Sequence, residues 1–234
     1  MKKKTRWPIY LIIGLIITFI AFTVPLPYYI EVPGTSEDIR KVLQVNNQSD
    51  QEEGSYQFVT VGVKHARLVD LVYAWLTPFT DIHSAKEMTG GSSDAEFMRI
   101  NQFYMETSQN MAKYQGLKSA GKEIELKYLG VYVLTVTDNS TFKGILNIAD
   151  TVTAVNDKTF ESSKEMVDYV NSQTLGDKVK VTYQEDGKVK TAEGKIITLE
   201  NGKNGIGIGL IDRTEVSSDV PIKFSTAGIG GPSA

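Results

Sequence analysis

The amino-acid sequence predicts an α+β protein with one N-terminal transmembrane helix. Three observations predict this class. Residues 7–26 form an uncharged run as long as a bilayer is thick, two later segments (68–76 and 93–121) carry helical signals, and from residue 122 onward short runs alternate apolar and polar residues. The chain has 234 residues, of which 41% are apolar and 23% charged, which is the composition of a folded protein.

Composition also excludes several kinds of function. The net charge is −3, so nothing in the overall charge favours a nucleic-acid partner, and we expect none. The chain has no cysteine, which excludes disulfides, thiolate metal sites and a cysteine nucleophile. The two histidines, His65 and His83, do not have the spacing of metal ligands. We therefore expect no metal and no cofactor.

The membrane segment is predicted from charge and length. Twenty residues at about 1.5 Å each span roughly 30 Å, the thickness of the bilayer hydrocarbon. Residues 1–6 form a basic lead, which the positive-inside rule keeps in the cytoplasm. Everything after residue 26 then lies outside, so we expect a single-pass protein of the cell membrane whose bulk is extracellular.

A cleaved signal peptide is the alternative for this segment. Its marker is a pair of small residues before the cut, and Ala21 and Thr23 are the nearest candidates. The sequence Val24-Pro25-Leu26-Pro27 follows them and suits cleavage poorly, which favours an uncleaved anchor.

Residues 27–120 are predicted as an extracytoplasmic α+β segment. Residues 56–61 alternate apolar and polar side chains, as a strand does. Residues 68–76 have helical length, and Pro78 follows them. A second helix begins near Ser93, which forms a capping box with Glu96, and it ends at Gly121.

Residues 121–200 are predicted as a compact unit of several strands and one helix. The helix opens at Ser162, which has capping-box spacing to Glu165, and residues 185–188 form a hairpin turn. The predicted strands are 124–128, 131–136, 151–155, 179–183 and 192–199.

This unit resembles a PDZ domain of the kind found in bacterial proteases. The resemblance is carried by Leu129-Gly130-Val131-Tyr132-Val133 and by residues 143–156, which follow the pattern Gly-Leu-x-x-Gly-Asp-x-Ile-x-x-Val-Asn-Gly. The chain departs from the pattern at Ala149 and Asp157, where glycine is usual, and Asp150 is interpreted as a structural turn residue.

The resemblance implies a peptide-binding groove, since PDZ domains add an extended peptide to a sheet edge. It implies that Leu129, Gly130 and Val131 form the loop that holds the peptide carboxylate. Met166 and Val170 would line the far wall of the groove. The alternative is a PDZ fold that serves only for packing.

The C-terminal residues carry two signals. Residues 206–211 have glycine at every second place, which predicts a strand with other backbone packed closely against it. Residues 230–234 read Gly-Gly-Pro-Ser-Ala, which on its own is typical of a flexible terminus. With the preceding segments, this ending resembles the nucleophile motif of Lon-type serine proteases.

The order of anchor, outer segment, PDZ domain and this motif resembles the membrane-anchored Lon-like PDZ proteases of Gram-positive bacteria, which include pheromone-processing endopeptidases. The resemblance makes residues 205–234 the start of an incomplete Lon-like protease domain and Ser233 its nucleophile. The base in such enzymes is a lysine downstream of the serine, which is not in this chain, and Lys223 does not match its position. The sequence has no phosphate loop, so we expect an ATP-independent enzyme.

Two hypotheses follow. The first is a membrane-anchored, ATP-independent serine endopeptidase of the Ser–Lys type that cleaves extracytoplasmic peptides or proteins, with the 234-residue chain itself inactive. The second is a non-catalytic, membrane-tethered PDZ module that binds exported peptides. Residues 40–120 are either a separate domain or the first half of the protease domain.

Overall fold

The computed structural model describes residues 6–226 and 228–231. The chain divides into two compact units, of which the first comprises Met1–Asp38 and Tyr56–Ser93. The second comprises Ile39–Ser55 and Asp94–Ala234. Residues of the predicted outer segment 27–120 therefore contribute to both units, and each unit is considered by itself.

The first unit begins with helix α1, Trp7–Thr23, whose apolar side chains are exposed on all sides. The helix ends three residues before the predicted boundary at residue 26, and β1 starts at Pro25. A proline disfavours helical geometry in the residue before it, and Val24 is accordingly extended, with ψ 117°. Among the described residues, no helix is both long enough and apolar enough to cross a membrane. The predicted transmembrane helix over 7–26 is therefore not supported by the structure.

The rest of the first unit is a small antiparallel sheet with short helices. The strand order is β3-β1-β4, with bounds β1 Pro25–Asp38, β3 Gln57–Arg67 and β4 Asp81–Ser84. Helix α3, Leu68–Leu76, confirms the predicted helix over 68–76, and α4, Ala85–Thr89, follows β4. The His65 ring packs against the Tyr29 ring at 4.3 Å between centroids and a tilt of 31°, and His83 lies beside Glu31, so each histidine has a local packing partner.

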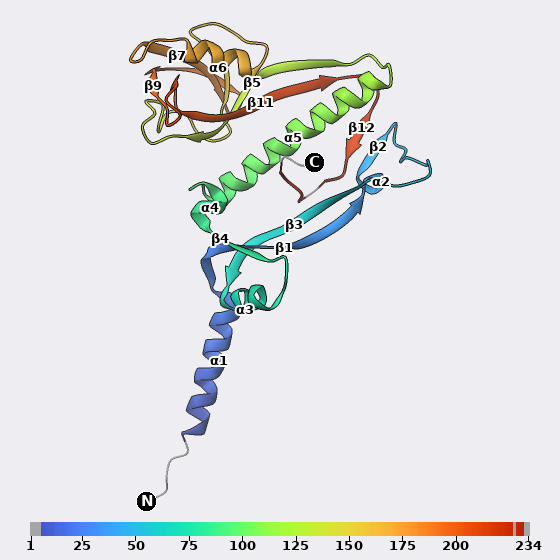
Figure 1. Ribbon diagram of the computed structural model, residues 1–234, viewed down its shortest axis with the longest axis vertical. Helices are drawn as coiled ribbons and strands as arrows, with labels where there is room; N and C mark the ends of the chain where they lie inside the picture. The colour runs from blue at the N-terminus through green and yellow to red at the C-terminus, as the bar shows by residue number, and fades with distance from the viewer. Residues whose placement is uncertain (1–5, 227, 232–234) are drawn as a thin grey trace, which may run out of the picture. The chain divides into compact units, whose positions relative to one another are not determined.

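The second unit is built on a five-stranded antiparallel sheet with the order β11-β5-β6-β7-β8 (Figure 1). The strands of this sheet are β5 Glu125–Val136, β6 Thr151–Val155, β7 Lys178–Glu185, β8 Lys188–Lys195 and β11 Ile208–Ser217. Two pairs of short strands accompany this sheet. In one, β9 (Ile197–Thr198) pairs with β10 (Asn204–Gly205). In the other, β2 (Leu43–Val45) pairs with β12 (Ile222–Phe224), and the short helix α2 (Ile39–Val42) precedes β2. The predicted combination of helices and strands is confirmed.

The core of the second unit lies between this sheet and helix α6, Ser163–Asn171. β-Branched residues dominate it because they pack well on a pleated surface. Phe142 is the largest fully buried side chain of this core. The core valines are fully or almost fully buried: Val131, Val133, Val152, Val155, Val179 and Val181. Helix α6 contributes Met166 and Val170, which are one turn apart and therefore share a face.

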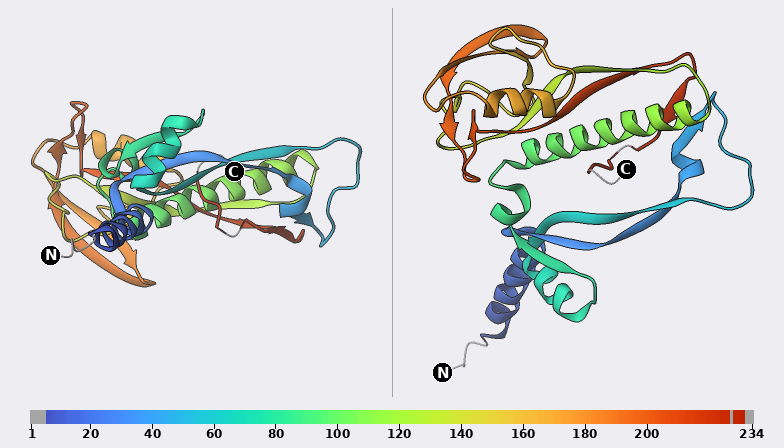
Figure 2. Two further views of the ribbon diagram at one scale, coloured as in Figure 1. Left: turned by 90° about the horizontal axis from the view of Figure 1, so that it is seen from below. Right: turned by 45° about the horizontal axis from the view of Figure 1, so that its top comes forward.

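Helix α5, Asp94–Ser119, confirms the predicted helix that begins after Ser93, and it lies along β5 and β11 (Figures 1 and 2). The Phe103 ring stacks on the Tyr132 ring at 3.9 Å and 8°. Two side chains of α5 also hydrogen-bond to β11: Thr107 Oγ1 donates to the Asp212 carbonyl at 3.0 Å, and Asn110 Nδ2 donates to the Thr214 carbonyl at 2.8 Å. Stacking and hydrogen bonds together hold α5 on the sheet.

Candidate functional site

A small apolar groove lies between helix α6 and strand β11. Its cavity measures about 60 Å³. Helix α6 and the residues around β10 and β11 line it: Met166, Val167, Val170, Asn171, Leu199, Gly205, Ile206, Gly207, Ile208 and Leu210. The lining is mostly apolar, so the groove suits an apolar side chain.

The helix wall of the groove is fixed by capping and packing. The Ser162 hydroxyl accepts a hydrogen bond from the Glu165 amide at 3.2 Å, which confirms the predicted N-cap. From this start, Met166 and Val170 face inward and are 2% and 5% exposed, while Val167 is half-buried at the groove. The helix thus presents both a buried face and a groove wall.

Hydrogen bonds at both ends set the spacing between α6 and the strand wall. At the start of the helix, the Ser163 amide donates to the Asp212 carboxylate of β11 at 3.2 Å. After the end of the helix, Asn204 Nδ2 of β10 donates to the Gln173 carbonyl at 2.8 Å. These two hydrogen bonds, one at each end of α6, therefore fix the distance between the helix and the opposite wall of the groove.

The other wall begins with a glycine-rich segment in which a side chain on any of three alternate residues would collide with neighbouring side chains. A Cβ on Gly205 would lie 2.6 Å from Leu199 Cδ1, and one on Gly209 would lie 2.4 Å from Thr135 Oγ1. Gly207 has φ +74°, and its Cβ would lie 2.5 Å from Thr137 Oγ1. The predicted crowding of this segment is therefore present, but the close neighbours are side chains, such as those of Leu199, Thr135 and Thr137, and not the predicted backbone.

The turn is tied to the loop that follows β5. The Ile206 carbonyl accepts a hydrogen bond from Ser140 Oγ at 2.5 Å, and the Gly207 carbonyl accepts one from the Thr137 amide at 2.9 Å. Ser140 is buried, and its hydroxyl also accepts from the Phe142 amide at 3.1 Å. These bonds fix the backbone at the mouth of the groove.

Strand β11 lies at the edge of its sheet and pairs with β5 on one side. The other side of an edge strand offers backbone N–H and C=O groups to an incoming extended chain. In β11 the carbonyls of Asp212 and Thr214 already accept hydrogen bonds from α5, so the part of the strand beside α6, from Ile208 to Leu210, is the part considered for an added chain. An edge strand beside an apolar helix wall is the geometry that peptide-binding domains use to add a strand and seat alternate side chains.

The predicted carboxylate loop is not a loop in the structure. Leu129, Gly130 and Val131 lie inside β5, where Gly130 pairs with Arg213 of β11 and Val131 pairs with both β11 and β6. Val131 is fully buried. The segment is therefore held inside the sheet, not at the mouth of a groove.

The physical reason for the difference is a β-bulge. The pairing shifts by one residue between Gly130 and Tyr128, and Gly130 has φ +129°. A Cβ on Gly130 would lie 2.2 Å from the Val152 carbonyl oxygen, so the glycine permits close approach of β6. A glycine in a strand and a glycine in a binding loop give the same signal in sequence.

Met166 and Val170 do lie on the helix wall, where the sequence placed them, and their role in binding stays a prediction. The residues missed by the sequence analysis are 205–208 and Leu210, which form the opposite wall. In the sequence, the alternating glycines of this segment indicated a crowded strand, but they did not indicate that α6 lies opposite it across the groove. Strand and helix meet there because β11 pairs with β5 and α6 packs on the core that β5 helps to form.

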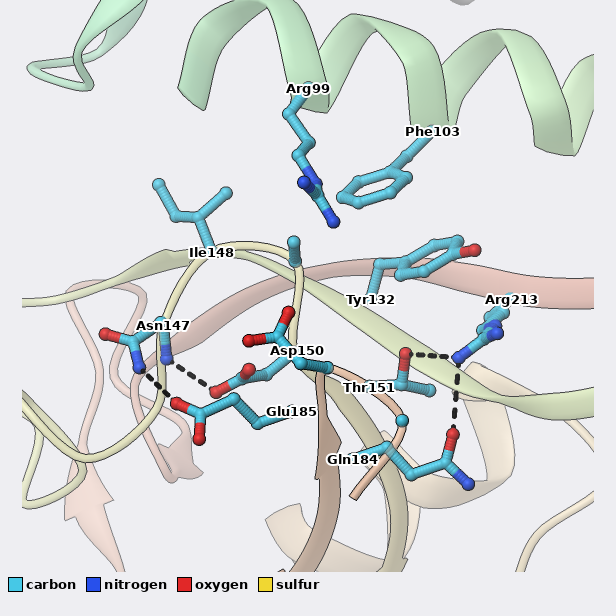
Figure 3. Close-up of a pocket in the computed structure, with 13 residues that line it drawn as sticks. Arg99, Phe103, Tyr132, Asn147, Ile148, Asp150, Thr151, Gln184, Glu185 and Arg213 are labelled. Carbon is cyan, nitrogen blue, oxygen red and sulfur yellow. Dashed lines mark hydrogen bonds between the residues drawn. The ribbon is translucent and has the colours of Figure 1, made fainter. Parts of the chain in front are cut away.

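A second, larger cavity of about 400 Å³ lies between α5 and a part of the sheet that includes Tyr132, residues 147–151 and residues 184–187 (Figure 3). Arg99 and Phe103 project into it from α5, toward Tyr132 of β5. Arg213 NH1 donates to Thr151 Oγ1 at 2.9 Å, and its guanidinium lies 5.3 Å from the Tyr132 ring centroid. The cationic groups and the stacked rings together line the side of the cavity next to α5.

Acidic residues line the opposite side of this cavity. Asp150 is buried, which raises the pKa of its carboxyl, although a hydrogen bond from the Asn147 amide at 2.8 Å acts in the other direction. That hydrogen bond closes the turn 147–150, which is the structural role predicted for Asp150. Tyr128 of β5 does not line this cavity; its hydroxyl is buried, and burial raises its pKa, with the charges of Asp212 and Glu165 acting in the same direction.

The predicted nucleophile, Ser233, lies outside the described residues. The chain that leads to it is described as far as Gly231, whose amide donates to the Asn101 carbonyl of α5 at 2.9 Å. Lys223, which does not match the position of the family's base, lies in β12 and donates to Asn47 Oδ1 at 2.6 Å.

Comparison with known proteins identifies one domain. Residues 101–196 match the family model of the PDZ domain. None of the curated proteins compared with the chain matches it. The matched region includes α5 from Asn101 onward, all of β5 to β8 and helix α6.

Two solved structures of similar sequence are also PDZ domains. One is the PDZ domain of an SdrC-like protein from Listeria monocytogenes, 35% identical, which covers 37% of this chain and 93% of that one, with a TM-score of 0.35. The other is the PDZ domain of an SdrC-like protein from Listeria innocua, 38% identical, with coverage of 35% and 92% and a TM-score of 0.33. Because these TM-scores are low, the assignment rests on the family model.

Proposed function

Because this chain carries a PDZ domain, we propose that its groove between β11 and α6 binds the C-terminal end of a peptide as an additional strand. The observation that carries the proposal is the edge strand β11 beside the apolar wall of α6, with a glycine-rich turn at its start. Backbone amides in that turn would hold the peptide carboxylate, and an apolar terminal side chain would enter the 60 Å³ cavity.

The groove residue that best tests this proposal is Val167, because it lines the cavity and is only half-buried. Val167→Glu places a negative charge beside the peptide carboxylate, and we expect binding to weaken by more than about tenfold, or about 1.4 kcal/mol. The matched control is Val189→Glu, the same exchange at a side chain of β8 that is 66% exposed and lies outside the groove.

The measurement is fluorescence anisotropy with labelled peptides that end in an apolar residue, each as the free acid and as the amide. We expect the free acid to bind more tightly. Equal binding of the two forms would show that no carboxylate is recognised, and equal loss in both variants would place the binding site outside the groove.

We also propose that the domain is tethered to a membrane through residues 7–26, with the bulk of the chain outside. Support comes from the absence of charge in this run and from the exposed apolar side chains around the whole of α1. Protease added outside intact protoplasts should digest most of the chain and leave a short N-terminal fragment. Full protection of the PDZ domain would contradict the topology.

Finally, we propose that Ser233 is the nucleophile of an ATP-independent serine endopeptidase of the Ser–Lys type. Support comes from the Gly-Gly-Pro-Ser-Ala sequence over residues 230–234 and from its position after a PDZ domain. A serine hydroxyl becomes a nucleophile only when a neighbouring base removes its proton, and a lysine supplies that base in the proposed mechanism.

A cleavage assay on secreted peptides tests this proposal by comparing the protein with its Ser233→Ala variant. Only the protein with Ser233 should cleave, because loss of one member of a catalytic unit costs orders of magnitude in rate. Cleavage by the alanine variant would remove Ser233 from the mechanism. Absence of cleavage by both proteins would favour the non-catalytic binding module.

A further inference from the structure

Helix α3 and the turn that follows it carry an unusually exposed apolar surface. Trp75 is 84% exposed, Phe79 is 87% exposed, and Leu76 between them is 67% exposed. Val72 and Tyr73 are also exposed large apolar residues of the same segment. Single exposed apolar residues are normal, whereas a contiguous group marks a contact surface.

Charge is absent from this surface. Residues 71–80 read Leu-Val-Tyr-Ala-Trp-Leu-Thr-Pro-Phe-Thr and contain no ionisable acid or base apart from the tyrosine. The one acidic residue of α3, Asp70, is buried, and its carboxylate accepts hydrogen bonds from Lys64 Nζ at 2.8 Å and from the Arg67 amide at 2.9 Å. The acid is thereby turned away from the exposed surface.

Both polar side chains of the turn are hydrogen-bonded within the segment. Thr77 donates twice to the Tyr73 carbonyl, through its amide at 3.0 Å and through its hydroxyl at 2.7 Å. The hydroxyls of Thr77 and Thr80 lie 3.2 Å apart, within hydrogen-bond distance of each other. These bonds lower the cost of moving the two threonines from water into a less polar medium.

The residue types indicate which medium that is. Tryptophan, tyrosine and phenylalanine at the end of a short apolar helix are typical of the water–lipid interface, where amphipathic rings are most stable. Helix α3 also contacts α1 within the first unit, and Figure 1 shows it beside the end of α1 from which β1 begins. The exposed surface of α3 is therefore continuous with the apolar surface of α1.

We propose that residues 68–80 form a second lipid-contacting element, in which Trp75, Leu76 and Phe79 insert into the interfacial layer of the membrane. This inference rests on the proposed membrane attachment through residues 7–26 and adds to it. Attachment by α1 alone would leave the first unit free to tilt, whereas a second contact restricts its orientation to the bilayer.

The chain provides its own reporter, because it has two tryptophans, Trp7 and Trp75. In the conservative variant Trp7→Phe, Trp75 is the single tryptophan of the full chain. The variant is mixed with phosphatidylcholine–phosphatidylglycerol vesicles whose acyl chains carry bromine, which quenches tryptophan only on contact. We expect Trp75 emission to shift to shorter wavelength and to be largely quenched, relative to vesicles without bromine.

A matched control places the single tryptophan in the second unit instead of the first. In the triple variant Trp7→Phe, Trp75→Phe, Val189→Trp, the tryptophan occupies an exposed position of β8 in the second unit, and we expect no quenching. Flotation of the same samples on a density gradient reports attachment of the chain separately.

The outcomes separate the two proposals. Quenching of Trp75 without quenching of the Val189→Trp reporter supports the second lipid contact. A chain that floats with the vesicles while Trp75 stays unquenched overturns this inference and leaves attachment through α1 in place. A chain that does not float overturns the attachment and this inference together.

Discussion

Gly207 offers the sharpest test of the packing at the groove. A side chain at this position would cost free energy of unfolding in two ways, through backbone strain and through crowding. Its φ is +74°, a conformation that costs an alanine about 1–2 kcal/mol relative to glycine. In addition, a Cβ would lie 2.5 Å from Thr137 Oγ1 and 2.9 Å from Ser140 Cβ. Overpacking of this kind costs about 1–3 kcal/mol. Gly207→Ala should therefore destabilise the second unit by about 2–5 kcal/mol.

Gly187 provides the matched control. Its φ is +78°, and a Cβ there would have no neighbour within 4 Å. Gly187→Ala should thus show the backbone cost alone, about 1–2 kcal/mol. The difference between the two variants measures the crowding at the groove.

The assay is amide hydrogen exchange of buried strand residues such as Val155 and Val181, which exchange when the second unit unfolds. Both tryptophans lie in the first unit, so fluorescence would not report this event. Exchange in Gly207→Ala should exceed that in Gly187→Ala by about 5- to 150-fold, which corresponds to about 1–3 kcal/mol. Equal exchange in the two variants would refute the close packing of the turn against residues 137–140.

Three further predictions follow from the same contacts. Ser140→Ala leaves the buried Ile206 carbonyl and Phe142 amide without their partner, and it should destabilise the second unit by about 1–3 kcal/mol in the same exchange assay. Phe103→Ala removes the ring stacked on Tyr132 and should cost about 3–5 kcal/mol, whereas Met98→Ala at an exposed position of α5 should change stability by less than about 0.5 kcal/mol. Burial would raise the pKa of Asp70, but its bonds to Lys64 and the Arg67 amide lower it below the ordinary value of 3.8, so the first unit should lose stability as the pH falls below 3.8. Asp70→Asn should lose less over that interval, as measured by amide exchange of Ile30 and Ala66, which are fully buried in the first unit, above and below pH 3.8.

The sign of the pH effect follows from linkage. The folded state holds Asp70 ionised more strongly than the unfolded state does, so its contribution is complete above the unfolded pKa and is lost on acidification through the folded pKa. Equal acid sensitivity of the wild type and Asp70→Asn would show that another group controls the loss.

Much of the local structure was predictable because its causes are local. Pro78 follows the end of α3, and Ser162 caps α6 through a bond to Glu165 three residues away. The hairpin between β7 and β8 turns at Asp186 and Gly187, both with positive φ. Such signals act within a few residues, where side-chain type alone decides backbone geometry.

The candidate site was only half predictable, for a physical reason that Gly130 and Gly207 share. Both glycines have positive φ and both are in close contact with other backbone or side chains. In sequence each reads as a glycine beside a β-rich run. Only the pairing of β5 with β6 and β11 places Gly130 inside the sheet, and only the packing of α6 places Gly207 beside a groove.

By itself, the sequence determined the α+β class, the PDZ-like order of strands and helix, the crowded alternating glycines and the uncharged N-terminal run. The tertiary structure decided which strand is left at the sheet edge, and so where a peptide could add. That choice depends on the pairing of residues 208–217 with residues 125–136, about eighty positions earlier in the chain. Glycine tolerance, apolar periodicity and capping act over a few residues, whereas the location of an open edge is a property of the whole sheet.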